Sequence, residues 1–297
     1  MAFRKLSFLE KTALKYSNRD KYKDYKFLNK LSKVKVPDLD WRSPGVAHFK
    51  HSGNAGDIIY ALPTIYALAQ DGVAHIHLNV NKPGLYKKDF KHPLGNVMLN
   101  DKMVAMLKPL FLQQPKIRMC DIYENQPLDF DLDIFRDYPF GIGGHIARWY
   151  FLIYAVYADL SQPWLVAPTD NTFNDAIVIG RSFRYRTAGI DYTFINKYPK
   201  KIFVGIPDEY EDMKRMIPSL EYQPVKDFLE MAIIMNGCRL FIGNQSFPFS
   251  VAEGLKCRRL LEVCYAIPNV IVEGKGGYDF CYQPQFEKMV KELYEKA

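Results

Sequence analysis

Cysteine is scarce in this sequence and does not occur in closely spaced pairs. Five cysteines are scattered over 297 residues, with no CxxC motif. They are Cys120, Cys238, Cys257, Cys264 and Cys281. An odd, dispersed set argues against a disulfide framework and against a cysteine-ligated zinc site. We therefore expect free thiols in a reducing compartment and predict a cytoplasmic protein.

Long apolar segments are also missing. The N-terminus carries charges but has no apolar core of the kind found in signal peptides. The longest aromatic and apolar run, residues 149–160, is too short to cross a bilayer and contains several tyrosines. We expect no transmembrane segment, although contact with a membrane surface stays open.

Beyond residue 45 the chain has no excess of either charge. Residues 1–45 hold twelve Lys/Arg and five Asp/Glu, whereas the rest of the chain holds 28 of each sign. The net charge of +7 therefore belongs to a basic N-terminal extension, residues 1–45, in which residues 7–15 are predicted as a short helix. Such an extension can bind phosphate polymers or an anionic membrane, or can simply keep the protein soluble.

The remaining chain has the pattern of two α/β domains. Residues 46–81 are predicted as strand, glycine turn, helix and strand, which is how a parallel sheet begins. A polar linker at residues 167–175 is followed by a new series of strands and helices, in which residues 258–264 and 269–274 are predicted as strands. We predict an N-terminal domain over residues 46–166 and a C-terminal domain over residues 167–297. The last helix is expected either within the second domain or packed back on the first.

Several common catalytic fingerprints are absent. The chain has no GxGxxG sequence that would indicate a nicotinamide cofactor, no Walker lysine and no GxSxG elbow. Instead, HSGNAGDIIYALP at positions 51–63 places Gly53, Asn54 and Gly56 in a turn before a helix. Asp57 falls in the first turn of that helix, where a carboxylate can cap backbone N–H groups.

Two segments, read together, resemble a known family. SGNAGDIIYALPTIYAL at 52–68 and CRLFIGNQSFPFSVAEGLKCRRLLE at 238–262 are similar to the two motifs of glycosyltransferase family nine, the ADP-heptose heptosyltransferases. The resemblance implies a GT-B fold, in which two Rossmann-like domains face a cleft. The C-terminal domain would bind a nucleoside-diphosphate sugar and the N-terminal domain an acceptor, either a carbohydrate or a lipid-linked glycan.

The resemblance also implies a mechanism. Asp57 matches the family's general base, which takes the proton of the acceptor hydroxyl. Transfer would invert the anomeric centre and need no metal ion and no cofactor beyond the sugar donor. The acidic stretch Asp131–Asp133 lies in the presumed acceptor domain and is interpreted as solvated acid rather than as a metal site.

Without a metal, cationic side chains must offset the charge of the leaving diphosphate. In the resembled family the loop after the first strand of the second domain contacts the diphosphate, and here that loop contains Arg181, Ser182, Arg184 and Arg186. Guanidinium groups suit phosphate oxygens, and Arg181 and Arg186 are the preferred candidates.

The second motif supplies the remaining donor-site candidates. Gln245 and Ser246 precede a helix whose N-terminus can hold phosphate. Asn244 stands where the family usually has aspartate, and Glu253 is expected to bind the nucleotide ribose. His145 and Arg148 either shape an acceptor pocket or, in a simpler reading, mark a helix start with a surface histidine.

Two alternatives remain open at this stage. The basic extension and the many Tyr and Phe residues would also suit a DNA glycosyltransferase acting on hydroxymethylated bases, which would have to be flipped out of the duplex. The aspartate-to-asparagine departure at Asn244 is compatible with a nucleotide-binding protein of the same fold that has no activity.

Overall fold

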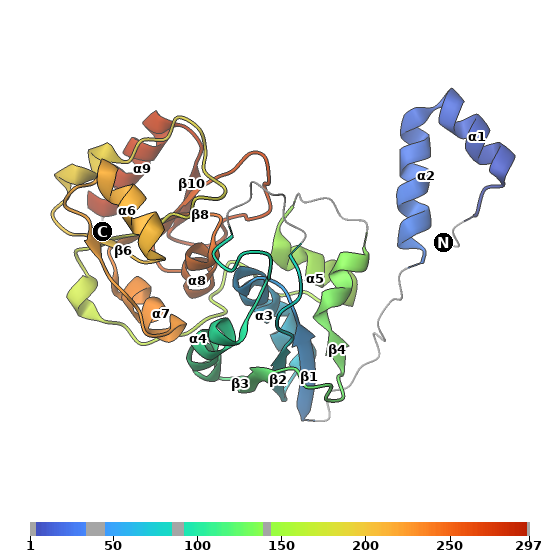
Figure 1. Ribbon diagram of the computed structural model, residues 1–297, viewed down its shortest axis with the longest axis horizontal. Helices are drawn as coiled ribbons and strands as arrows, with labels where there is room; N and C mark the ends of the chain where they lie inside the picture. The colour runs from blue at the N-terminus through green and yellow to red at the C-terminus, as the bar shows by residue number, and fades with distance from the viewer. Residues whose placement is uncertain (1–3, 34–44, 85–91, 139–143, 296–297) are drawn as a thin grey trace.

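The computed structural model describes residues 4–33, 45–84, 92–138 and 144–295. Figure 1 shows two α/β lobes and a separate pair of N-terminal helices. Each lobe contains one parallel sheet. The predicted α/β architecture of two Rossmann-like domains is therefore confirmed.

The N-terminal lobe is built on a four-stranded sheet. Its strands are β1 (Val46–His51), β2 (Val73–Leu78), β3 (Ile117–Ile122) and β4 (Phe130–Asp131). Their order is β3-β2-β1-β4, so the chain moves outward from β1 in one direction and then returns to pair on its other side. Alternate β1 residues, Ala47, Phe49 and His51, are fully buried and set the register of the sheet against the core.

Three helices complete this lobe. They are α3 (Ala55–Ala69), α4 (Asp101–Leu112) and α5 (Ile146–Tyr154). Helix α3 is buried on most sides because it packs against β1, β2, α5 and a helix of the other lobe. The 3-10 helix η1 (Leu132–Asp137) follows β4 directly. It replaces the solvated acidic loop that the sequence predicted there.

The C-terminal lobe has six parallel strands in the order β10-β9-β8-β5-β6-β7. The strands are β5 (Ile177–Gly180), β6 (Lys201–Phe203), β7 (Glu221–Tyr222), β8 (Leu240–Asn244), β9 (Arg259–Glu262) and β10 (Gly277–Phe280). The chain builds outward from β5 through β7 and then starts again at β8 on the other side. Residues 269–274, expected as a strand, are irregular, and β10 is formed by the following residues instead.

The helices of this lobe are α6 (Pro207–Met216), α7 (Phe228–Gly237), α8 (Phe247–Leu255) and α9 (Gln283–Glu295), with the 3-10 helices η2 (Asn171–Phe173) and η3 (Thr193–Lys197). Helix α9 packs within the C-terminal lobe and not on the N-terminal lobe. Its Phe286 stacks on Phe280 of β10 at 4.0 Å between ring centroids and also touches Tyr192 and Phe194. Of the two positions expected for the last helix, the structure has the one within the second domain.

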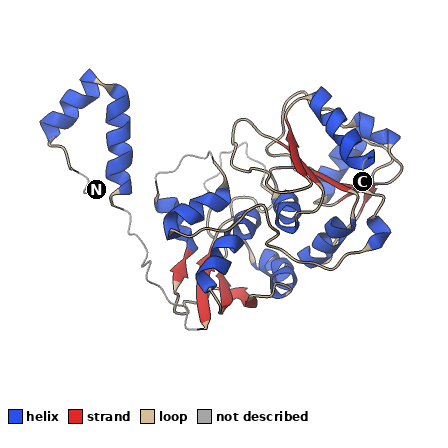
Figure 2. Ribbon diagram, turned by 180° about the vertical axis from the view of Figure 1, so that it is seen from behind, coloured by secondary structure: helices blue, strands red, loops and turns tan. Residues whose placement is uncertain are grey.

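The N-terminal extension folds as a helical hairpin of α1 (Phe8–Ser17) and α2 (Arg19–Leu31). The helix predicted near residues 7–15 is present, and α2 was not foreseen. Figures 1 and 2, which view the molecule from opposite sides, both show this hairpin set apart from the lobes. In the described part of the chain no helix is both long enough and apolar enough to span a membrane.

Candidate functional site between the two lobes

Each sheet has one point where the strand order reverses, and in open α/β sheets ligands bind at the carboxyl ends of the strands beside such a point. In the N-terminal lobe this point lies between β1 and β4, and in the C-terminal lobe between β5 and β8. Helices α3 and α8 start there and contact one another, as Figure 1 shows. The position of a Cβ on Gly56 would lie 3.6 Å from the Ser250 hydroxyl, so the first turn of α3 packs closely on α8.

Asp57 is the third residue of α3 and lies at this junction. Its carboxylate accepts hydrogen bonds from the backbone and side chain of Asn54, the N-cap residue, which confirms the capping geometry foreseen from the sequence. Burial raises the pKa of Asp57 above its usual range. The cations Arg136, from η1, and Arg184, from the C-terminal lobe, act in the opposite direction. The carboxylate therefore feels positive charge from both lobes.

Gly53 is required by close packing rather than by an unusual backbone angle. A Cβ at this position would stand 2.5 Å from the His51 ring and 3.1 Å from both Asp57 Oδ2 and Arg136. The backbone N–H of Gly53 donates to His51 Nδ1 at 2.8 Å, and His51 Nε2 lies 2.7 Å from the Tyr150 hydroxyl. Burial lowers the pKa of His51 to about 4, so the ring is neutral at physiological pH.

Asp133 organises the other side of the junction, and here the sequence-based interpretation was wrong. Its carboxylate accepts from the backbone N–H of Ser52 at 2.9 Å and from the Ser52 hydroxyl at 2.6 Å. It also forms an ion pair with Arg136 at 2.5 Å. Burial alone would raise the pKa of Asp133, but His51, Ser52 and Arg136 together lower it to about 2. Asp133 is thus a paired carboxylate that holds the β1–α3 turn, not solvated acid.

In the C-terminal lobe, Asn244 at the end of β8 fastens the loop that follows β5. Its Oδ1 accepts from the Ser182 backbone N–H, and its Nδ2 donates to the carbonyl oxygens of Ser182 and Arg184. Tyr185 adopts a left-handed backbone conformation with φ of 58°, which is uncommon for an aromatic residue. The charge of Arg184 acts to lower the pKa of Asp57, while the pKa of Tyr185 is raised mainly by burial and further by the charge of Asp57.

Arg181, one of the two preferred phosphate ligands, has a different environment from the one expected. Its guanidinium makes a two-point contact with Glu262, with Nε–Oε2 and Nη2–Oε1 distances of 2.6 and 2.9 Å. It also stacks over the Tyr192 ring. The exposed fractions of Arg181 and Glu262 are 4% and 0%, so this cation is buried and neutralised within its own lobe.

Arg186, the other preferred candidate, is also paired. Its Nη1 contacts Asp212 at 2.6 Å, and its Nε donates to the carbonyl oxygen of Ser182. Arg184 is the arginine of this loop whose charge acts on Asp57 and on His92 of the N-terminal lobe. Arg184, rather than Arg181 or Arg186, is therefore the candidate phosphate ligand of this loop.

Glu253 does not have the position that a ribose ligand requires. It is fully buried in α8, pairs with Arg259 at 2.5 Å and with Lys256, and accepts from the backbone N–H of Glu273. Those partners use both carboxylate oxygens. This correction follows from the helical phase of α8, which turns Glu253 towards Arg259 of β9.

The side chains of Gln245 and Ser246 differ in their hydrogen-bond partners. Gln245 is buried, donates to the Ile267 carbonyl oxygen and accepts from the Cys264 backbone N–H, so it holds two loops together. Ser246 occupies the N-cap position of α8 but makes no capping bond with its side chain. Its hydroxyl lies 3.3 Å from the carbonyl oxygen of Asn244.

His145 and Arg148 lie at a contact between the two lobes. His145 is 2% exposed, and its Nδ1 accepts from the Ala147 backbone N–H at the start of α5. The expectation of a surface histidine was therefore wrong. Arg148 forms an ion pair of 2.6 Å with Glu273 of the C-terminal lobe. Both residues help to fix how the two lobes meet.

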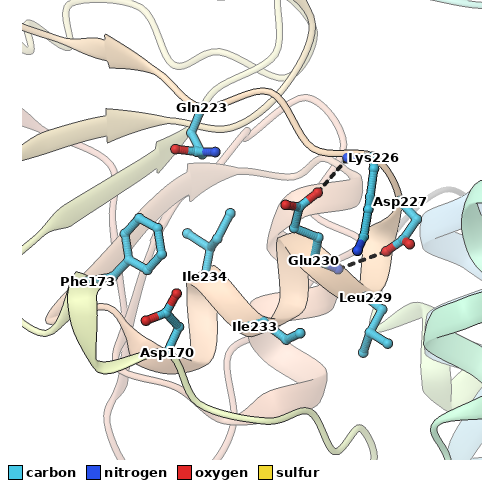
Figure 3. A pocket seen from close by; sticks show the side chains of 9 residues that line it. All are labelled: Asp170, Phe173, Gln223, Lys226, Asp227, Leu229, Glu230, Ile233 and Ile234. Carbon is cyan, nitrogen blue, oxygen red and sulfur yellow. Dashed lines mark hydrogen bonds between the residues drawn. The ribbon is translucent and has the colours of Figure 1, made fainter.

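Two cavities in the described part of the chain lie away from this junction. One, of about 410 Å³, lies beside α7 and is shown in Figure 3. Glu230 accepts from the Lys226 backbone N–H and donates its own backbone N–H to Asp227, so these polar groups are already paired. The other, of about 450 Å³, lies behind the C-terminal end of α3, next to Trp164. Neither contains residues proposed from the sequence as site residues.

The residues around Asp57 that sequence reasoning missed come from β1, η1 and α5 of the N-terminal lobe. They are His51, Asp133, Arg136 and Tyr150. In the sequence, only the charged residues at positions 131–136 pointed to this region, and they do not reveal that β4 pairs with β1.

Together, the two parallel sheets, their reversed strand order and the junction at α3 and α8 define a GT-B-type α/β protein. No family model and no curated protein sequence matches the chain. Solved structures do. A glycosyl transferase of family 9 from Veillonella parvula matches with a TM-score of 0.55 and 12% identity, covering 86% of this chain and 98% of that one.

The heptosyltransferase WaaC of E. coli is similar in the same way. Its structure with ADP-2-deoxy-2-fluoro heptose gives a TM-score of 0.53 at 9% identity and covers 85% of this chain and all of that one. Its structure with ADP gives 0.54 at 9% identity, covering 84% and 99%. These matches confirm, at the level of the fold, the family resemblance found in the two sequence motifs.

Proposed function

We propose that this protein is a glycosyltransferase that moves a sugar from a nucleoside-diphosphate sugar to an acceptor hydroxyl. The observation that carries the proposal is the position of Asp57. It lies where strand order reverses in one lobe, and the charge of Arg184, from the corresponding point of the other lobe, acts on it. The similarity to structures of WaaC with ADP and an ADP-sugar analogue supports a nucleoside-diphosphate donor.

Asp57 is proposed as the general base. As the acceptor oxygen bonds to the anomeric carbon, its proton passes to the Asp57 carboxylate. The bond from the anomeric carbon to the diphosphate oxygen breaks, and its electron pair leaves with the nucleoside diphosphate. Because burial raises the pKa of Asp57, the carboxylate is a stronger base than an exposed aspartate. Attack from the face opposite the leaving group inverts the anomeric centre.

Arg184 and the N-terminus of α8 are proposed to bind the leaving diphosphate. A guanidinium can donate two hydrogen bonds to phosphate oxygens. The first turn of α8 adds backbone N–H groups that no side chain caps, and its helix dipole favours negative charge. No step of this scheme uses a metal ion, so we propose metal-independent transfer.

The test compares Asp57→Asn with Asp101→Asn, a matched control in the exposed first turn of α4. Donors are screened as a panel of nucleoside diphosphates and their sugars by thermal shift, since a ligand of the folded state raises the melting temperature. Turnover is measured as release of nucleoside diphosphate. We expect Asp57→Asn to lower turnover by about 10²–10⁴-fold with nucleotide affinity nearly unchanged, while Asp101→Asn has no effect.

Full turnover in Asp57→Asn would exclude Asp57 as the base. Tight binding of a nucleotide sugar without turnover on any acceptor would favour the non-catalytic alternative. Activity confined to DNA with hydroxymethylated bases would identify the DNA glycosyltransferase.

A further inference from the structure

The α1–α2 hairpin contains its own structural determinants. Ser7 and Glu10 form a reciprocal capping box at the start of α1. Asn18 ends α1, and its side chain caps α2 by accepting from the backbone N–H of Lys21 at 2.9 Å. The Tyr25 hydroxyl accepts from the backbone N–H of Leu6, which ties the second helix to the entry of the first. These hydrogen bonds link the two helices and their connection within the hairpin itself.

Large apolar side chains lie on the outside of this hairpin. Phe8, Leu9 and Tyr16 are 80%, 78% and 81% exposed. Their spacing of one and seven residues places them on one side of α1. Phe27 and Leu28 on α2 are also exposed. Single exposed apolar residues are common, but a group of them on one helix side marks an interaction surface.

Helix α2 adds a row of cations. Arg19, Lys23, Lys26 and Lys30 recur at intervals of four, three and four residues, and all are exposed. They therefore share one side of the helix over about 16 Å, at 1.5 Å of rise per residue. Described residues 4–33 contain ten Lys/Arg and three Asp/Glu, which equals the net charge of the whole protein. We call these four residues the basic row.

We propose that the α1–α2 hairpin docks the protein on an anionic lipid bilayer. The basic row contacts lipid phosphates, and Phe8, Leu9 and Tyr16 enter the boundary between headgroups and acyl chains. Helices of this kind combine a cationic side with exposed Phe, Leu or Trp. A nucleic acid would also attract the basic row, but it offers no apolar layer for Leu9 and Phe8. The apolar side of α1 therefore favours the bilayer.

The experiment measures co-sedimentation of the full-length protein with vesicles. One set is pure phosphatidylcholine, and the other contains about 30% phosphatidylglycerol, an anionic lipid. We expect binding only to the anionic vesicles, and weaker binding at about 1 M than at about 0.1 M salt because salt screens the charges. The row variant, with Arg19, Lys23, Lys26 and Lys30 all changed to Gln, should lose about 100-fold or more in affinity.

A control variant changes four exposed lysines of the lobes to Gln and so alters the net charge equally. These are Lys102, Lys275, Lys288 and Lys291. It should bind anionic vesicles within about threefold of the wild type, because charges far from the surface are screened. An apolar variant, Phe8→Ser with Leu9→Ser and Tyr16→Ser, should also lose binding despite its unchanged charge. Circular dichroism reports whether the helices persist in each variant.

Three results would overturn the proposal. They are wild-type protein that stays in the supernatant with anionic vesicles, equal losses in the row and control variants, and an apolar variant that binds as tightly as the wild type. Fluorescence anisotropy with single- and double-stranded DNA forms the other arm. DNA binding that depends on the basic row, without vesicle binding, would assign the hairpin to nucleic acid instead.

Discussion

The buried pair of Arg181 and Glu262 allows a test that separates a structural role from a role in binding. Arg181→Met leaves the Glu262 carboxylate in a fully buried site, where, among the described residues, the Tyr192 hydroxyl and the Thr187 backbone N–H still donate to it. Breaking one partner of a buried ion pair costs about 3–5 kcal/mol. We expect Arg181→Met to lower the free energy of unfolding by that amount, measured by urea denaturation with circular dichroism.

The double variant Arg181→Met with Glu262→Gln removes both charges, while the new amide oxygen can still accept from Tyr192. Its loss of stability should be smaller than the sum of the two single losses by about 3 kcal/mol. Its affinity for a nucleoside diphosphate should stay near that of the wild type. Arg184→Gln should instead lose about 10–100-fold in affinity, the usual value of one charged hydrogen bond.

The reasoning is refuted if Arg181→Met unfolds like the wild type, or if the double variant is stable and yet loses nucleotide affinity as Arg184→Gln does. The second result would return Arg181 to the diphosphate site that the sequence suggested.

Two further predictions concern packing and pH. Gly56→Ala should be neutral or stabilise the protein by up to about 1 kcal/mol, because the new methyl group would lie 3.6 Å or more from its neighbours and alanine favours the helix. Gly254→Ala should instead destabilise the protein by about 1–3 kcal/mol, because its methyl group would lie 2.7 Å from Leu165. Thermal unfolding measures both effects. Because the pKa of His51 is lowered to about 4 in the folded protein, against about 6.5 when unfolded, the unfolded state binds the proton first as pH falls. The contribution of neutral His51 to the free energy of unfolding should be complete above pH 6.5 and should fall by about 1.4 kcal/mol per pH unit between pH 6.5 and pH 4. In urea titrations at several pH values, His51→Gln should remove this part of the pH dependence.

The sequence could reveal the two-lobed fold because the relevant signals are local. Glycine turns, apolar strands and capped helices recur within short windows, and α3 and α8 start close to where their motifs placed them. The position of Asp57 followed from the same local pattern. The end of α5 has no local signal in the sequence, because apolar and aromatic residues continue beyond Tyr154, where the helix ends.

The site residues that sequence reasoning misplaced depend on pairings between distant segments. Ser52 meets Asp133, and Arg181 meets Glu262, in each case across 81 positions of the chain. Both contacts exist because the strand order reverses and brings β4 beside β1, and β8 and β9 to the other side of β5. An arginine in a loop after a strand looks the same in the sequence whether it points to a ligand or to a buried carboxylate.

Asn244, which stands where the family usually has aspartate, makes such a long-range contact with the loop after β5. Its amide nitrogen donates to the carbonyl oxygens of Ser182 and Arg184, while its oxygen accepts from the Ser182 backbone N–H. An aspartate here would face those two carbonyl oxygens with an acceptor, so only an amide satisfies both sides of this contact. The asparagine therefore fits the loop of this chain and anchors the Arg184 backbone. The departure at this position is accordingly explained by loop anchoring and is no argument for a lost activity.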